Sequence, residues 1–224
     1  MRLHKIAALA SLSIVSLHSH SSEALISLQA NQGVYETNTT SGGEMTSVRG
    51  SILIESETGD FHRATIHSAI DATSDPGRDQ ERYLNAEYNL GTFWYPKASA
   101  SDYSIWSGIA TWQHEDSIGN AGNVDRSARS LYIPLGFEGA LPVSYPSSYF
   151  VFGADVKLGI DSTVEVNGVK EANASAIGYS AWLGMDFQFE SGNALEFRFE
   201  YTGFEIDASD YEFTSNLISL GYRF

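Results

Sequence analysis

Apolar and polar side chains alternate strictly along several long stretches of the chain. In residues 193–204, NALEFRFEYTGF, every second side chain is large and apolar for most of the segment, and those between are charged or polar. Successive side chains of a β-strand point to opposite faces, so this pattern predicts a strand with one apolar face. That face consists of Leu195, Phe197, Phe199 and Tyr201. The same arrangement recurs at residues 149–161 and 176–189, which predicts an all-β chain.

Weaker alternation marks three earlier segments, residues 47–56, 61–71 and 82–95. Residues 102–113 are ambiguous, because they place isoleucines on one face and tryptophans on the other. In residues 131–143, Pro134 and the Gly139-Ala140 step predict a β-bulge, since proline and glycine both disturb a regular ladder.

The connectors between these segments alternate between long polar links and mostly short ones. The long links are TNTTSGGEMT, SDPGRDQE, EDSIGNAGNVDRSA, STVEVNGVKEANAS and DASDYE, and the short ones are ETGD, KASAS and ESGN. This alternation is typical of membrane barrels, whose two ends carry loops of unlike length. The sequence therefore predicts an antiparallel up-and-down transmembrane β-barrel of about ten strands. The link LPVSYPSS is longer than its class predicts, so eight strands is the alternative.

A β-sandwich also alternates, with its apolar face turned inward and its polar face in water. Three features favour the barrel over the sandwich. The strands run to about ten residues or more, their apolar faces are bulky and aromatic, and charged residues recur at mid-strand on the opposite face. Aromatic residues near the strand ends also suit the two interfacial girdles of a membrane barrel.

The N-terminus has the pattern of a secretory signal peptide. Arg2 and Lys5 precede an apolar run at residues 6–17, and Ser22-Glu23-Ala24 offers small residues for a signal peptidase. We predict a signal peptide at residues 1–24 and one barrel domain at residues 25–224. No later apolar stretch approaches the roughly 18 residues that a membrane-spanning helix needs, so any membrane crossing would be made by strands.

Charge and cysteine content narrow the function classes. The formal net charge of -15 disfavours nucleic acid as a partner, because phosphates are repelled by an acidic surface without a basic patch. The chain has no cysteine, so an exported domain here is held by backbone pairing and burial without disulfides.

The last residues, LISLGYRF, have an apolar side chain at every second position up to the end of the chain. These positions are Ile218, Leu220, Tyr222 and Phe224. This ending resembles the C-terminal signature by which Gram-negative outer-membrane proteins are recognised for barrel insertion. The whole predicted mature chain is similar to the small outer-membrane β-barrel class, which includes the OmpA barrel, OmpX and porin-like small barrels. The resemblance implies a location in the cell outer membrane, handling by the barrel-assembly machinery and surroundings of lipid and lipopolysaccharide.

The charged faces of the predicted strands form a candidate lumen network. Its predicted members are Arg49, Glu55, Arg63, Asp71, Glu87, Asp155, Lys157, Asp186, Glu196, Arg198 and Glu200, and Asp161 shares the same predicted face. One interpretation is a salt-bridged plug, because a barrel of eight to ten strands can be nearly filled by side chains and buried charges need partners. The alternative is a narrow channel in which the excess of acids over bases favours cations.

Catalytic patterns are weak. His114 and Ser117 faintly resemble the His-x-Ser motif of the lipid A deacylase family, but the extra residue puts the two on opposite strand faces. His114-Glu115-Asp116 formally contains the His-x-Asp couple of the omptin proteases, without a matching pair of aspartates. We find no His and Cys spacing for a metal, and we predict no enzyme activity and no cofactor.

The sequence thus favours a monomeric outer-membrane barrel with a structural or surface-interaction role. A cation-preferring solute channel is the alternative, and a deacylase-like hydrolase ranks below it. Acidic residues of the predicted outer loops could also bridge divalent cations to lipopolysaccharide, since hard cations prefer oxygen ligands. They are Asp75, Asp79, Glu81, Glu115, Asp116, Asp125, Asp207, Asp210 and Glu212.

Overall fold

The computed structural model describes residues 23–38, 40–74, 82–96, 101–118, 124–143, 147–172, 174–207 and 211–224. In these ranges the chain forms strands only, and it contains no helix that could cross a membrane. The predicted signal peptide lies almost wholly outside them and stays a prediction.

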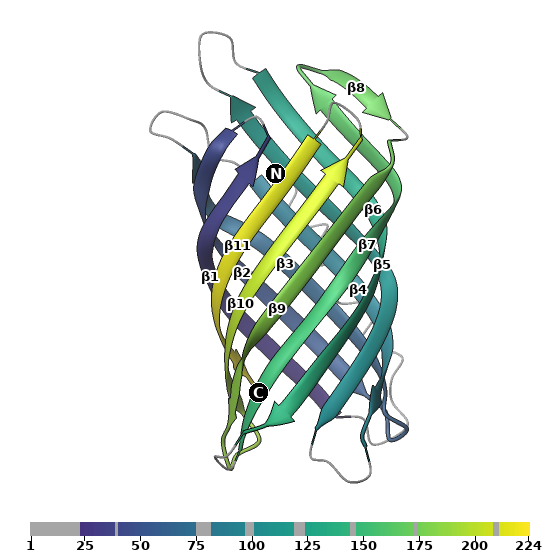
Figure 1. The fold of residues 1–224 in the computed structure, drawn as a ribbon, viewed down its shortest axis with the longest axis vertical. Coiled ribbons are helices and arrows are strands. Elements are labelled where there is room, and N and C mark those ends of the chain that lie inside the picture. The colour runs from purple at the N-terminus through teal and green to yellow at the C-terminus, as the bar shows by residue number, and fades with distance from the viewer. Residues whose placement is uncertain are drawn as a thin grey trace.

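Ten long strands form a closed antiparallel barrel (Figure 1). The strands are β1 (Glu23–Thr37), β2 (Thr40–Glu55), β3 (Asp60–Ser74), β4 (Arg82–Trp94), β5 (Asp102–Ile118), β6 (Val124–Pro142), β7 (Ser148–Val166), β9 (Ala176–Gln188), β10 (Ala194–Ile206) and β11 (Tyr211–Arg223). Each pairs with its neighbours in sequence, and β1 pairs with β11 to close the barrel. The short β8 (Val169–Ala172) pairs only with β7 and extends it as a hairpin beyond one end. The predicted all-β barrel is confirmed, with ten strands rather than eight.

The end of the chain takes part in this closure. The backbone N–H of Phe224 donates to the carbonyl of Ile26, the N–H of Ile26 donates back to Phe224, and both distances are 2.9 Å. The Phe224 ring is 48% exposed on the outer surface, in line with the exposed Leu220 and Tyr222. The last residue therefore contributes both to strand pairing and to the apolar exterior.

Deleting Phe224 should reduce assembly, because it removes two closing hydrogen bonds and one ring of the outer apolar surface. We expect less heat-modifiable, folded protein in membrane fractions analysed by gel electrophoresis. Phe224→Tyr keeps the backbone pairing and the ring, so it should assemble like the wild type. Normal folded levels in the deletion variant would contradict this role.

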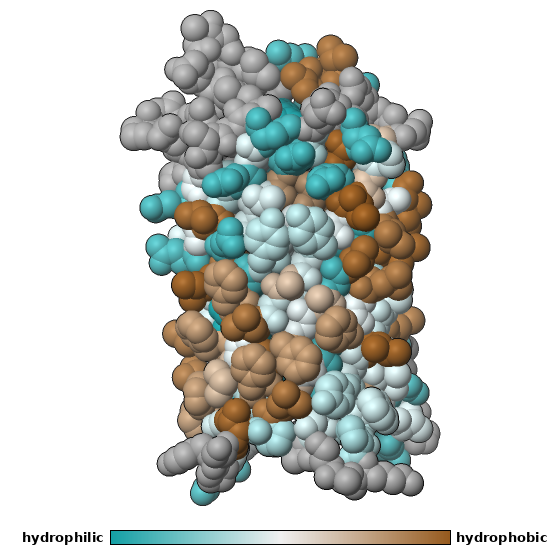
Figure 2. All heavy atoms as spheres, viewed as in Figure 1, coloured by the Kyte–Doolittle hydropathy of each residue, from teal (hydrophilic) through white to brown (hydrophobic). Residues whose placement is uncertain are grey.

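Large apolar side chains cover part of the outside of the barrel. Exposed examples on neighbouring strands are Leu28, Leu90, Ile105, Phe137, Leu158, Leu183, Phe199 and Leu220. Figure 2 shows this surface as an apolar zone toward the end where the chain terminates. β5 resolves the ambiguity in its sequence: Ile105 and Ile109 face outward, whereas Trp106 and Trp112 are buried inside.

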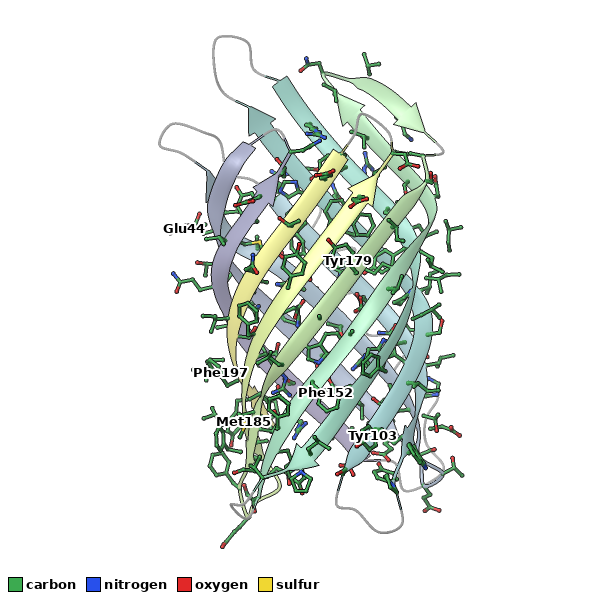
Figure 3. The ribbon with its side chains drawn as sticks, viewed as in Figure 1. Glu44, Tyr103, Phe152, Tyr179, Met185 and Phe197 are labelled. Atoms are coloured by element: carbon green, nitrogen blue, oxygen red, sulfur yellow. The ribbon has the colours of Figure 1, made fainter. Side chains whose placement is uncertain are left out.

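Toward the other end the pattern inverts. On β10 the outer face changes from Phe199 to the exposed Glu205, while Phe204 and Ile206 become buried inside. Figure 3 shows this change in polarity along the barrel axis. Phe197 and Glu44 both lie at the outer surface, with Glu44 farther from the end where the chain terminates. An apolar interior under a polar exterior is the arrangement of a protein in water. The barrel therefore extends well beyond its apolar zone.

Two β-bulges overturn parts of the predicted lumen face. Thr46 pairs with Asp71 but Ser47 pairs with Ala69, so Ile70 is an extra residue in β3, and Asp71 is exposed outside. An extra Ile160 in β7 turns Asp161 outward in the same way. An inserted residue reverses the alternation beyond it, which is why both aspartates were predicted on the wrong face.

The bulge predicted at Gly139-Ala140 is wrong, because both residues pair in register with β5 and β7. Three predicted long links, residues 37–46, 115–128 and 162–175, are also mostly strand. β1 and β2 are separated only by residues 38–39, and β7 continues into a hairpin that turns at Asn167-Gly168. Both turn residues have positive φ, 50° and 78°, which suits the Asn-Gly preference of tight hairpins.

Candidate functional site

The interior of the barrel contains an apolar layer. It lies in the half of the barrel opposite the end where the chain terminates at Phe224. The layer includes the buried side chains Tyr35, Met45, Tyr83, Trp112, Tyr132, Phe204, Tyr211 and Phe213. The rings of Trp112 and Phe204 stack at 4.6 Å with an interplanar angle of 10°, and those of Tyr83 and Phe213 lie 5.7 Å apart. These pairs join β5 to β10 and β4 to β11, which are not neighbours in the barrel wall. The layer therefore packs across the lumen.

His114 belongs to this layer and not to the rim, where the sequence placed it. Its side chain is 2% exposed, and Nδ1 lies 2.6 Å from the Tyr211 hydroxyl. The guanidinium of Arg126 stacks on the Tyr211 ring, with its carbon 4.2 Å from the ring centre. The side chains of Asp116 and Ser117 lie outside the described residues, so neither catalytic pattern is tested beyond the position of His114.

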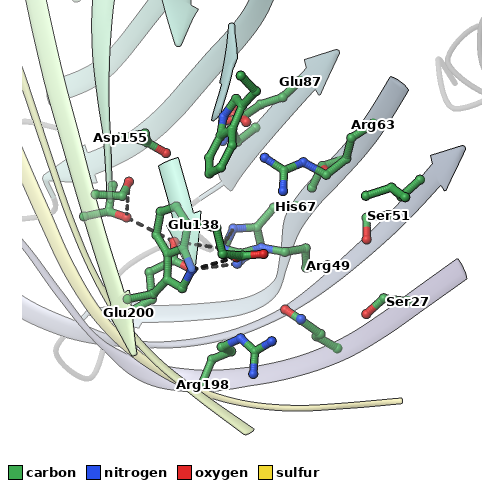
Figure 4. Close-up of a pocket in the computed structure, with 18 of the residues that line it drawn as sticks. Ser27, Arg49, Ser51, Arg63, His67, Glu87, Glu138, Asp155, Arg198 and Glu200 are labelled. Carbon is green, nitrogen blue, oxygen red and sulfur yellow. Dashed lines mark hydrogen bonds and ion pairs between the residues drawn. The ribbon is translucent and has the colours of Figure 1, made fainter. Parts of the chain in front are cut away.

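Below the aromatic layer, Arg49 and Glu200 form a two-pronged ion pair across the β1–β11 closure region. Arg49 donates from Nη1 at 2.6 Å and from Nη2 at 2.8 Å to the two carboxylate oxygens (Figure 4). His67 lies 3.3 Å from Arg49, and Thr202 donates to Glu200 at 3.2 Å. Such bidentate pairing satisfies both charges and fixes their geometry.

Two further ion pairs lie in the interior, one within β7 and one between β9 and β10. Lys157 donates to Asp155 at 2.5 Å and to the Ser180 hydroxyl, and Arg198 pairs with Asp186. The carboxylate of Asp186 also lies 3.4 Å from Arg223, at the end of β11.

The remaining interior acids are held mainly by neutral donors. Glu196 accepts from Ser27 at 2.7 Å and from Gln29 at 3.0 Å, and it lies 3.4 Å from Arg223. Glu87 accepts from Tyr132 at 2.7 Å and from Asn85 at 3.0 Å.

These groups surround a cavity of about 200 Å³. Trp112, Tyr83 and Phe204 line it beneath the aromatic layer, whereas Leu25, Leu53 and Arg223 line it toward the end where the chain terminates. Among the described residues, five cations and five acids line it, namely Arg49, Arg63, Lys157, Arg198 and Arg223 with Glu87, Glu138, Asp155, Glu196 and Glu200. The predicted excess of acids is therefore absent from the cavity lining.

Four predicted acids are absent from the cavity lining, and Glu138 and Arg223 line it although they were not predicted. Asp186 is buried but is held by Arg198 and Arg223 outside the lining. Asp71 and Asp161 lie outside because of the bulges, and Glu55 lies at the barrel end, where it accepts from the Tyr95 hydroxyl at 2.6 Å. Burial and this hydrogen bond raise the pKa of Tyr95. Glu138 and Arg223 were not predicted to face the lumen. The alternation could have indicated them, because Glu138 lies on the same strand face as Pro134 and Gly136, and Arg223 lies on the same face as Ser219.

In the described part of the chain, no three His, Asp or Glu side chains come together as a metal site. The acidic loop residues Asp75, Asp79, Glu81 and Asp210 lie outside that part, so the predicted cation bridging stays a prediction.

Comparisons with known proteins agree on the architecture. The outer membrane protein beta-barrel domain family matches residues 7–224. No curated protein matches the chain by sequence. The outer membrane protease OmpT from Escherichia coli is similar in structure, with a TM-score of 0.58 at 9% identity over 91% of this chain and 96% of that one.

Two weaker structural similarities come from proteins of other roles. The translocator domain of autotransporter NalP from Neisseria meningitidis has a TM-score of 0.47 at 15% identity, covering 99% of this chain and 95% of that one. An outer membrane channel from Pseudomonas putida F1 has a TM-score of 0.45 at 8% identity, covering 89% and 94%. At 9% identity, the similarity to OmpT indicates the fold alone. The chain belongs to the outer membrane protein beta-barrel domain family and is located in the outer membrane.

Proposed function

We propose that this protein is a monomeric, closed outer-membrane barrel with a structural or surface-interaction role. The observation that carries the proposal is the aromatic layer across the lumen. Trp112 is 1% exposed and stacks on Phe204 from the opposite wall. Side chains can nearly fill the interior of a barrel of this size, and a buried aromatic layer leaves little room for solute passage.

The extension beyond the apolar zone supports the surface-interaction part of the proposal. Its outer wall carries Glu44, Glu205 and Glu212, and the β7–β8 hairpin projects past the barrel end. A rigid polar wall outside the bilayer offers a surface for contacts with lipopolysaccharide headgroups or with other molecules.

The alternative of a cation-preferring channel has less support. Its argument was an acidic lumen, whereas the described cavity lining has equal numbers of acids and bases. A charge-balanced cavity lining gives no reason for ion selectivity. The deacylase-like alternative has no described nucleophile beside His114, whose ring lies instead against Tyr211.

Cysteine accessibility tests whether the outer side is closed. The chain has no native cysteine, so Ser51→Cys in the cavity would be the sole thiol. In intact cells of a porin-deficient host, a charged thiol reagent should label it poorly, and labelling should rise after osmotic shock admits the reagent to the periplasm. Val169→Cys, at a position 71% exposed on β8, should react in both conditions.

Equal labelling of the two cysteines in intact cells would contradict a closed outer side.

A further inference from the structure

Arg63 differs from the other cations of the cavity. Its guanidinium carbon lies 4.3 Å from the centre of the Trp106 ring and 5.8 Å from that of Phe61. It makes no hydrogen bond or ion pair with any described residue. Arg49, Lys157, Arg198 and Arg223 each have a carboxylate within 4.0 Å, whereas Arg63 has only a longer-range electrostatic interaction with Glu87.

Glu138 is the corresponding exception among the acids. It accepts one hydrogen bond, from Nε1 of Trp182 at 2.9 Å, and forms no ion pair with a described residue. A carboxylate has room for about four hydrogen bonds, so most of its accepting capacity is unused by these residues. Glu87, in contrast, accepts from Asn85, Asn89 and Tyr132.

Both groups face the same cavity, and two tryptophans connect them. Arg63 stacks on Trp106, the rings of Trp106 and Trp182 lie 5.9 Å apart, and Trp182 donates to Glu138. Figure 4 shows Arg63 and Glu138 among the side chains that line the pocket. The two side chains form no ion pair with each other.

Arg63 and Glu138 are partly buried in one cavity and form no ion pair with each other, so together they are complementary to a solute carrying both charges. We propose that the cavity binds a small zwitterion of the α-amino acid type, with its carboxylate on Arg63 and its ammonium on Glu138. Charge-assisted hydrogen bonds at both ends would fix its orientation, and the tryptophan rings would contact its apolar part.

The size and position of the cavity fit such a ligand. A space of about 200 Å³ accommodates a small solute, and the lining by Leu25, Leu53 and Arg223 reaches the end of the barrel where the chain terminates. Entry from that end leaves the aromatic layer intact. The proposal therefore goes beyond the closed-barrel function and does not depend on it.

Calorimetric titration of the purified, folded protein in detergent tests the proposal with three probes of similar shape. L-alanine carries both charges, propionate only the carboxylate and isopropylammonium only the ammonium. We expect L-alanine to bind at least tenfold more tightly than either analogue, and to change the tryptophan fluorescence, since Trp106, Trp112 and Trp182 line the cavity. Arg63→Gln and Glu138→Gln should each weaken its binding by about tenfold or more, as expected for loss of a charged hydrogen bond.

Arg63→Gln should fold, because it leaves no carboxylate without its partner, and heat modifiability on a gel checks this. Arg82→Gln is the matched control, since Arg82 is 81% exposed on the outer surface and lies outside the cavity lining. Absence of L-alanine binding to the wild type would overturn the proposal. So would equal binding of propionate or isopropylammonium, or an effect of Arg82→Gln as large as that of Arg63→Gln.

Discussion

Replacing Arg49 by methionine should lower the free energy of unfolding by about 3–5 kcal/mol, the usual cost of removing one partner of a buried ion pair. Arg49 makes both of its short contacts with Glu200, and the two side chains are 21% and 11% exposed. Without Arg49, the Glu200 carboxylate would keep its charge in the barrel interior with only Thr202 and weaker neighbours beside it. Urea titration of the folded barrel in lipid vesicles measures the change.

Two controls separate this effect from a general loss of packing. Arg82→Met breaks the exposed pair with Glu115 at 3.4 Å and should cost about 0–1 kcal/mol, as surface pairs do. The double variant Arg49→Met with Glu200→Gln should be more stable than Arg49→Met alone, because the unpaired charge is gone. Equal stability losses for Arg49→Met and Arg82→Met would mean that the interior pair is effectively in water.

Replacing Phe199 by arginine should cost about 2–4 kcal/mol if the apolar zone spans the bilayer and Phe199 lies near its midplane. Phe199 is exposed on the outer face of β10, between Phe197 and Tyr201. An arginine there would meet acyl chains and would have to reach toward an interface. The same urea titration from lipid vesicles gives the cost.

Glu205→Arg is the depth control, because Glu205 lies on the same face of the same strand but beyond the apolar zone. We expect about 0–1 kcal/mol there, as at an interface. Similar costs at the two positions would place the membrane boundary elsewhere on β10.

Much of the fold could be predicted from the sequence, because the period of two is visible in the residue pattern and is imposed by the geometry of a β-strand. Every apolar position assigned to β10 faces outward, since a slip by one residue would turn charges toward lipid. The inward positions of Arg198 and Glu200 follow from the same alternation. The C-terminal pattern likewise places Ile218, Leu220, Tyr222 and Phe224 on the outer surface.

The errors have local causes. Asp71 and Asp161 were misplaced because a bulge changes the parity of a strand without leaving a clear mark in composition. The aromatic layer was not predicted, because neither Phe204 nor Phe213 was assigned to a strand face. A sequence signal for it did exist: on β10 the apolar parity shifts after Tyr201, at the height where the outer face becomes acidic with Glu205.

Planar bilayer conductance of the purified, refolded wild type tests the closed lumen most directly. We expect no steady single-channel current above that of the lipid alone, because the aromatic layer around Trp112 and Phe204 spans the lumen and the charges beneath it are largely paired. Heat modifiability of the same sample would show that the barrel is folded. A reproducible open conductance that is absent from a denatured control would contradict the closed barrel and make the channel the better description of this protein.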